Sequence, residues 1–131
     1  MANSSHFDSQ SDLFDLVLEE VLTFRQQLTV SLPRGDYLLA QNVFLLVASA
    51  DSRGGVTVKE LTNSFGASPN SPRYHLEYFI KNKLFFTVSD PRDSRVKRVL
   101  LSESGKRVKE MIRGDLISFL ASGPVQEFVK E

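Results

Sequence analysis

The sequence predicts a mainly α-helical fold with one small β-ribbon, in the α+β class. Two helical stretches separated by a glycine-containing turn occupy residues 58–82. Two runs rich in β-branched and aromatic residues follow at 84–88 and 96–101, and a charged loop at 89–95 joins them. Helix, turn, helix and a hairpin with a basic tip is the layout of a winged helix-turn-helix, which we expect over residues 36–101.

The bulk composition favours a single domain over residues 1–131, because 41% hydrophobic residues suffice for a core. No apolar run approaches the roughly 18 residues of a membrane-spanning helix, and the N-terminus lacks the basic and apolar regions of a secretory signal. The chain has no cysteine, which excludes disulfides, zinc fingers and thiol redox sensors. We therefore expect a cytoplasmic protein without membrane association.

An N-terminal helix is expected over residues 10–32, before Pro33 and Gly35 end it. Apolar residues recur along one helical face, and more lie beside it: Leu13, Val17, Val21, Phe24 and Leu28, then Phe14, Leu18 and Leu22. Such a wide stripe favours contact both with the chain's own core and with a second copy, so we interpret the helix as a dimerisation helix. Burial within one chain is the alternative, since wide stripes are also ordinary.

The next helix, residues 37–50, is apolar almost all round, which predicts a central buried helix with Asp36 as its cap. Thr57 and Glu60 then have the spacing of a capping box. This spacing predicts a third helix over residues 58–65, the first helix of the helix-turn-helix.

The fourth helix is the candidate recognition helix. Pro69 and Pro72 allow two starts, and we expect a loose turn over residues 68–71 followed by regular helix from Pro72 to about Asn82. Its outer side carries most of its polar groups: Asn70, Ser71, Arg73, Tyr74, Glu77, Tyr78 and Lys81. His75 lies near the buried side, and we interpret it as packed and hydrogen-bonded rather than as a ligand or a switch.

After the ribbon, Ser102 begins a last helix, and residues 102–131 form the second expected dimerisation segment. Its apolar residues again recur at helical spacing. The candidate dimer interface combines both ends of the chain: Leu13, Val17, Val21, Leu116, Phe119, Leu120 and Phe128.

Charge is segregated along the chain, although the net charge is zero. Residues 1–50 hold 2 Lys+Arg and 6 Asp+Glu, residues 51–113 hold 13 and 7, and residues 114–131 hold 1 and 3. The basic middle coincides with the winged-helix stretch, which suits one cationic face and an anionic remainder. A solvated charged surface is the alternative that charge alone leaves open.

Residues 57–111 resemble the MarR family of winged-helix transcription regulators. The strongest match is the run Asp90-Pro91-Arg92-Asp93-Ser94-Arg95, followed by Val99, Leu101-Ser102 and Gly105. The family pattern there is D-P-x-D-R-R, a hydrophobic residue, L-T and G. A second match, VKELTNSFGASPNSPRYHLEYFIKNKLF, is similar to the family's helix, turn and recognition helix.

Three positions depart from the family pattern. Ser94 replaces the first wing arginine and removes one cation. Lys83 stands where the family usually has glycine, so a left-handed backbone there would be strained. Pro72 replaces a buried valine-type residue, which can change the angle of the recognition helix.

The resemblance implies a homodimer that binds double-stranded DNA at a pseudo-palindromic operator, with repression favoured over activation. Arg73 suits bidentate readout of guanine in the major groove, and Asp93 is implied to orient Arg95 into the minor groove. The candidate DNA-binding residues are Asn70, Ser71, Arg73, Tyr74, Tyr78, Lys81, Arg92, Asp93, Arg95 and Lys97, with Arg98 as a further phosphate contact. Packing of the two tyrosines against the wing, and simple turn closure by Asp93 and Arg95, are the structural alternatives.

No catalytic residue, metal site or cofactor is expected, because the chain has no cysteine and only His6 and His75. The resemblance allows for a small-molecule effector in a crevice between the terminal helices and the winged helix, of a chemistry that the sequence does not identify. A winged-helix protein-interaction module without DNA binding is the alternative function, favoured by the neutral net charge and by Ser94.

Overall fold

The computed structural model describes residues 9–35, 37–66 and 68–122, so the expected cap Asp36 and the interface residue Phe128 lie outside the described residues. That part of the chain is mostly helical with one small sheet. Its elements in order are α1 (Ser9–Ser31), α2 (Leu38–Ala50), the 3-10 turn η2 (Asp51–Arg53), β1 (Val56–Thr57), α3 (Val58–Thr62), α4 (Asn70–Lys81), β2 (Phe85–Ser89), β3 (Lys97–Leu101) and α5 (Glu103–Leu120). The expected order of helices and ribbon is confirmed.

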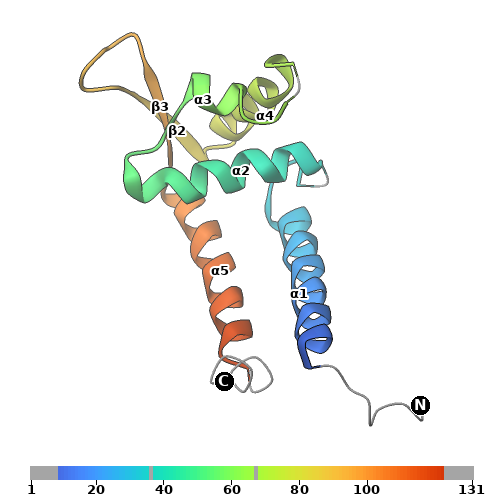
Figure 1. The fold of residues 1–131 in the computed structure, drawn as a ribbon. Helices are drawn as coiled ribbons and strands as arrows, with labels where there is room; N and C mark the ends of the chain where they lie inside the picture. Colours follow the sequence, from blue (N-terminus) through green and yellow to red (C-terminus); the bar gives the residue numbers. More distant parts are fainter. Residues whose placement is uncertain (1–8, 36, 67, 123–131) are drawn as a thin grey trace, which may run out of the picture.

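Helix α2 lies at the centre, with α3, α4 and the β-ribbon on one side and the two long helices α1 and α5 extending away on the other (Figure 1). Its Phe44 ring stacks on Phe85 of β2 at 5.9 Å and meets Phe79 of α4 edge-on at 6.3 Å between ring centres. All three rings are almost completely buried. The apolar circumference of α2 is therefore explained by contacts on several sides, although Tyr37 and Leu38 at its start are exposed.

The ribbon is an antiparallel hairpin in which β2 pairs with β3 from Phe85 opposite Leu101 to Ser89 opposite Lys97. The short strand β1 adds to the other edge of β3, with Val56 opposite Val99, giving the sheet order β1-β3-β2. Val99 and Leu101 face the core on one side of β3, as the alternating pattern predicts. The hairpin thus projects from the core and carries the loop of residues 90–96 at its tip.

The capping box that opens α3 is present: Glu60 N–H donates to the Thr57 hydroxyl at 3.0 Å, and Thr57 N–H donates to the Glu60 carboxylate at 2.9 Å. The predicted end at Phe65 is wrong, because α3 ends at Thr62. The Ser64 hydroxyl donates to the Glu60 carbonyl, which is an acceptor that a longer helix would use.

The predicted start of α4 is also wrong: the helix begins at Asn70, two residues earlier than Pro72. The missing N–H of Pro72 costs little, because the Ser68 carbonyl that it would have bonded accepts instead from Ser71 N–H at 3.2 Å. Arg73 N–H then donates to the Pro69 carbonyl at 3.2 Å. Both prolines therefore lie where a helix has no need of their N–H groups, and α4 presents Asn70 and Ser71 from its first turn.

Beyond the end of α4, Lys83 adopts the left-handed backbone that would be strained at this departure from the family pattern, with a φ of 64°. Leu84 N–H donates to the Phe79 carbonyl at 2.9 Å and Lys83 N–H to the Ile80 carbonyl at 3.0 Å, which closes the helix end. Lys83 therefore occupies a position that glycine adopts without steric cost.

We expect Lys83→Gly to raise the free energy of unfolding by about 1 kcal/mol, because the strain of a left-handed L-residue exceeds the entropy cost of glycine. Urea unfolding of the two proteins measures this difference. Lys81→Gly, in ordinary helical backbone two residues earlier, is the matched control and is expected to lower stability. Equal losses from the two substitutions would contradict the prediction.

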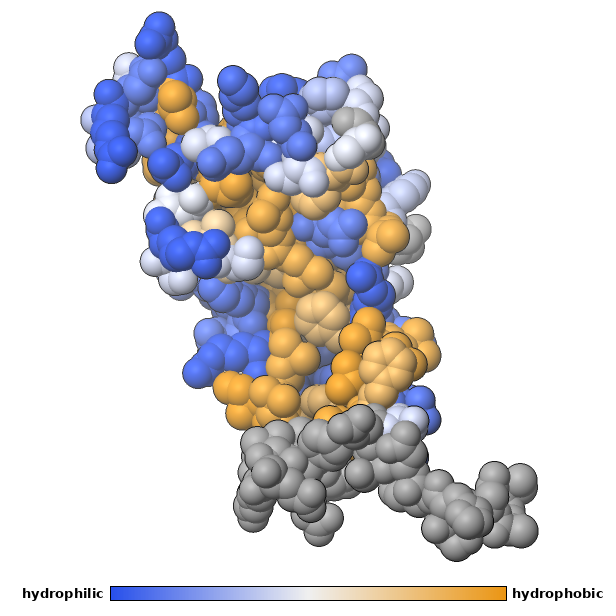
Figure 2. Space-filling view, in the orientation of Figure 1, coloured by the Kyte–Doolittle hydropathy of each residue, from blue (hydrophilic) through white to orange (hydrophobic). Residues whose placement is uncertain are grey.

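The two long helices leave many apolar side chains open to solvent. Figure 2 shows apolar residues extending from the centre of the molecule over the part formed by α1 and α5, whereas hydrophilic residues predominate over the wing, α3 and α4. On these two helices the exposed large apolar residues are Phe14, Val17, Leu18, Val21, Leu22, Val30, Met111, Leu116, Ile117 and Leu120. Within residues 9–35, 37–66 and 68–122, no helix is both long and apolar enough to cross a membrane.

Candidate nucleic-acid interface

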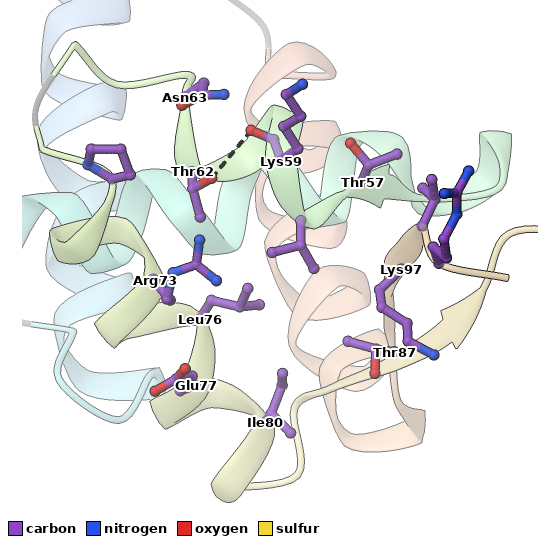
Figure 3. Close-up of a pocket in the computed structure, with 14 residues that line it drawn as sticks. Thr57, Lys59, Thr62, Asn63, Arg73, Leu76, Glu77, Ile80, Thr87 and Lys97 are labelled. Carbon is purple, nitrogen blue, oxygen red and sulfur yellow. Dashed lines mark hydrogen bonds between the residues drawn. The ribbon is translucent and has the colours of Figure 1, made fainter. Parts of the chain in front are cut away.

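A groove of about 890 Å³ runs between α3, α4 and the ribbon. Figure 3 shows Arg73 and Glu77 of α4 on one side of it, Thr87 and Lys97 of the strands on the other, and Lys59 of α3 between them. The groove is lined by one acidic residue, Glu77, and by four cationic residues, which are Lys59, Arg73, Arg95 and Lys97. The cations come from segments far apart in the sequence, so the fold itself assembles this cationic surface.

The cations on the helical side of the groove have no anionic partner in the part of the chain described. The ion pairs found there involve Arg95, Arg98 and Arg113, and none involves Lys59 or Arg73. Across the groove, the Lys97 ammonium donates to the Ser89 hydroxyl at 2.9 Å. Unpaired cations in an open groove suit an external polyanion, because no internal ion pair has to be broken first.

The exposed face of α4 carries polar groups from its first turn to its last. Asn70, Ser71, Arg73 and Lys81 are all exposed there, in agreement with the helical periodicity. Arg73 points into the groove, whereas Lys81 lies outside it at the far end of the helix. The fully buried residues of this helix are Pro72, His75, Leu76 and Phe79, so its polar face is left open to solvent.

In the wing, Asp93 holds Arg95 with a two-bond fork. The Arg95 Nε and Nη2 atoms donate to the two Asp93 carboxylate oxygens, each at 3.1 Å, and Arg95 N–H donates to the same carboxylate at 3.1 Å. The hydrogen bonds from the Arg95 side chain and backbone lower the pKa of Asp93, which keeps it ionised. The Arg95 side chain is nevertheless 88% exposed, so the fork aims the guanidinium without burying it.

Asp90 organises the base of the same loop, and its neighbour Arg98 corrects one expectation. Asp90 accepts from Arg92 N–H at 2.8 Å and from Arg98 Nε at 2.7 Å, and these bonds lower the pKa of Asp90. Arg98 also donates to the Gly55 carbonyl at 3.2 Å. Arg98 therefore fastens the wing to the segment before β1 and is not the free phosphate contact that we expected.

Arg92 lies at the exposed wing tip and does not line the groove. Its position follows from the turn, in which Arg92 N–H bonds to the Asp90 carboxylate two residues earlier. Arg92 is thus near Arg95 in the sequence but lies outside the groove that Arg95 lines.

Tyr74 and Tyr78 lie on the other flank of α4. Neither tyrosine lines the groove, and both pack against Arg34 instead of against the wing. The Arg34 guanidinium carbon is 5.0 Å from the Tyr74 ring centre and 4.6 Å from the Tyr78 ring centre. Successive helical residues are rotated by about 100°, which separates these tyrosines from Arg73 and Glu77. The structure therefore divides the predicted residues of α4 between two flanks.

His75 is buried, as expected, but its Nδ1 atom has no hydrogen-bond partner among the described residues, so the expectation of a hydrogen-bonded histidine is wrong for that atom. Burial lowers the pKa of His75, and the nearby charge of Arg34 lowers it further. The imidazole is thereby held in its neutral form among aromatic rings, with Tyr74 at 5.4 Å and Tyr37 at 5.7 Å between ring centres.

Two cations beside α4, one on each flank, are absent from the sequence-based set. Lys59 is exposed on α3 and lines the groove, and Arg34 lies in the turn between α1 and α2. Lys59 could have been found from its place in the first helix of the helix-turn-helix, which crosses a DNA backbone in this motif. No local signal pointed to Arg34, because its neighbours Tyr74 and Tyr78 are some forty residues away in the sequence.

The predicted dimer residues gather at a second, apolar hollow of about 410 Å³ between α1 and α5. Its lining includes five of them: Val17, Val21, Leu116, Phe119 and Leu120. Glu20 and Phe24 complete the hollow, and Leu13 is half-buried farther along α1. Within the part of the chain described, no cluster of three or more His, Cys, Asp or Glu residues could hold a metal ion.

No protein-family model and no curated protein matches the chain. Solved structures do match. The S. aureus MepR–DNA complex has a TM-score of 0.63 at 15% identity, covering 90% of this chain and 93% of that one. S. aureus MepR bound to ethidium bromide gives 0.61 at 18% identity over 92% and 88%.

A further match is CouR from Rhodococcus jostii RHA1 bound to p-coumaroyl-CoA, with a TM-score of 0.56 at 20% identity, covering 86% of this chain and 76% of that one. The proteins matched are MarR-type winged-helix regulators. The chain therefore has the MarR-type winged-helix fold, as the wing motif and the helix-turn-helix predict.

Proposed function

We propose that the chain is a sequence-specific, double-stranded DNA-binding transcription regulator that acts as a homodimer. The observation that carries the proposal is the groove in which Lys59, Arg73, Arg95 and Lys97 converge beside the exposed face of α4. DNA presents about one negative charge per 1.7 Å of helix axis, and such a groove can displace its counterions. Both S. aureus MepR in its DNA complex and this chain have the same fold over most of their lengths.

Base recognition is assigned to the first turn of α4. In the proposal this turn enters the major groove. There Arg73 donates hydrogen bonds to O6 and N7 of a guanine, and Asn70 forms hydrogen bonds with an adenine or a phosphate. Ser71 and Lys81 contact phosphates at the two ends of the helix. The early start of α4 supports this assignment, because Asn70 and Ser71 belong to its regular first turn rather than to a loose loop.

The wing is assigned to the minor groove. The fork from Asp93 leaves the Arg95 guanidinium exposed but oriented, which suits insertion into a narrow, electronegative A·T-rich groove. Arg92 and Lys97 contact the flanking phosphates. Serine at position 94, where the resembled family has arginine, leaves Arg95 to make the deepest contact of the wing.

A homodimer is supported by the apolar faces of α1 and α5, since such a surface is unusual on a monomeric protein. Two copies place two recognition helices on successive turns of one DNA face, which calls for a pseudo-palindromic operator. Bound at a promoter, such a dimer represses transcription by occupying the site. MepR with ethidium bromide and CouR with p-coumaroyl-CoA support the inclusion of a small-molecule effector in this proposal.

The test is binding of the full chain to the promoter DNA beside its own gene, measured by fluorescence anisotropy between about 50 and 200 mM salt. Six to ten phosphate contacts predict a loss of about 10³ to 10⁵ in affinity across this range. A scrambled duplex of equal length measures specificity. Absence of binding to both duplexes at low salt would overturn the proposal in favour of a protein-interaction module.

A further inference from the structure

Arg34 lies in the turn between α1 and α2, and its side chain is held by three aromatic rings. The guanidinium carbon is 4.6 Å from the ring centre of Tyr78, 5.0 Å from that of Tyr74 and 5.6 Å from that of Tyr37. Two of these rings belong to α4, so the turn and the recognition helix are joined through one cation. Aromatic faces orient a guanidinium by cation–π attraction but accept few of its hydrogen bonds.

The hydrogen-bonding capacity of Arg34 is unused in the part of the chain that the structure describes. Its Nε atom is buried without a hydrogen-bond partner, and no ion pair there includes Arg34. The neighbouring His75 is buried, and its lowered pKa keeps it neutral. Arg34 as a whole is half-buried, and with its Nε atom buried the terminal Nη groups are the donors left to bind an anion, in a geometry that suits phosphate oxygens.

Hydrogen bonds and close packing hold the backbone beside Arg34 in the described residues. The Gln41 side-chain amide donates to the Gly35 carbonyl at 2.7 Å, and Arg25 donates to the Gln41 amide oxygen at 3.0 Å. Gly35 packs so closely that an added Cβ would lie 2.2 Å from the Leu28 carbonyl oxygen. The backbone of Arg34 is left-handed, with a φ of 59°, so the chain keeps an arginine at a position where glycine would be less strained.

The position of Arg34 relative to α4 suggests its ligand. The major groove is about 12 Å wide and is walled by phosphates on both sides, so a helix within it has a phosphate strand along each flank. Arg73 and the wing serve one flank of α4, whereas Tyr74, Tyr78 and Arg34 form the other.

We infer that Arg34, held over Tyr74 and Tyr78, is a phosphate-binding site for the DNA strand on the side of α4 away from the wing. The inference rests on the proposed function and adds one contact per chain that no DNA-binding motif in the sequence indicates. Recognition of both walls of the major groove fixes the depth and tilt of α4, because a helix held on one flank alone can roll.

Arg34→Gly tests the inference, because glycine suits the left-handed backbone and the variant should fold without the side chain. With the promoter duplex as probe, log K is measured against log salt. Removal of one phosphate contact is expected to reduce the slope by about 0.9, and therefore by about two for a dimer in which both chains carry the substitution. Arg34→Gln, which also removes the charge, is expected to give the same reduction.

Arg113→Gln is the matched control, since it removes one exposed cation from α5 that does not line the groove between α3, α4 and the ribbon. Its salt slope is expected to equal that of the unaltered chain. If the salt slope of Arg34→Gly equals that of the control, the inference is overturned. The proposed function would still stand in that case, because the unaltered chain binds DNA. Failure of the unaltered chain to bind DNA would instead overturn both.

Discussion

Replacing Arg73 and Arg95 together with alanine is expected to lower the affinity for the promoter duplex by at least about 1,000-fold, to the level of non-specific binding. A good base contact contributes about 1–3 kcal/mol, and in a dimer each substitution acts twice. The two residues line one groove, but Arg73 belongs to α4 and Arg95 to the wing. Their removal therefore abolishes both the expected major-groove contact and the expected minor-groove contact with DNA. Fluorescence anisotropy at a fixed salt concentration measures the change.

The pair Arg107→Ala and Arg113→Ala is the matched control for this experiment, because it removes the same charge from exposed positions on α5. Its affinity should stay within a few-fold of the unaltered chain. Both variants should melt like the parent, since surface substitutions usually change stability by less than about 0.5 kcal/mol. If the Arg73 and Arg95 variant still discriminates the promoter from a scrambled duplex, the assigned surface is wrong.

Local sequence signals predicted the elements that position the candidate site. The Thr57 capping box, the alternation in residues 96–101 and the Asp93–Arg95 spacing each depend on groups within a few residues of one another. All three have the expected geometry in the structure. A single cationic face formed by one helix and the hairpin is expected to bring Arg73, Arg92 and Arg95 to one side of the molecule; Arg73 and Arg95 line one groove, and Arg92 lies outside it.

The partners that lie far apart in the sequence escaped prediction. From the sequence, Arg98 is a candidate phosphate contact, and only the position of β3 beside Gly55 and Asp90 shows that its Nε and Nη1 atoms donate inside the fold. From the sequence, Tyr74 and Tyr78 are candidate DNA contacts like Arg73. In the structure, Arg34 from the turn before α2 lies against both rings. Periodicity assigns a side chain to a face of its own helix, but it does not say what packs there.

The start of α4 shows a different limit. Two prolines within four residues predict a loose first turn, because each removes an N–H group. The first N–H groups of any helix have no intrahelical partner, so the cost depends on where the turn places each proline. Here the Ser68 carbonyl finds another donor, and the helix gains two polar residues at its exposed end.

Charged substitutions in the apolar hollow between α1 and α5 are expected to convert a dimer into monomers. Val21→Asp with Leu116→Asp would bury four unpaired carboxylates in the proposed interface, each at a cost of several kcal/mol. In a single chain both side chains are exposed, Val21 by 44% and Leu116 by 38%, so the fold of the monomer should survive. Sedimentation equilibrium measures the mass, and circular dichroism measures the helix content.

Val30→Asp is the control on the same helix, because Val30 is 86% exposed and does not line that hollow. It should leave the dimer intact. Monomers that bind one half-site at a time should lose about 10²- to 10⁴-fold in affinity for the promoter, although every DNA-contacting side chain is still present. If the Val21 and Leu116 variant stays dimeric, or if monomers bind as tightly as the parent, then the apolar faces of α1 and α5 serve some purpose other than pairing two recognition helices.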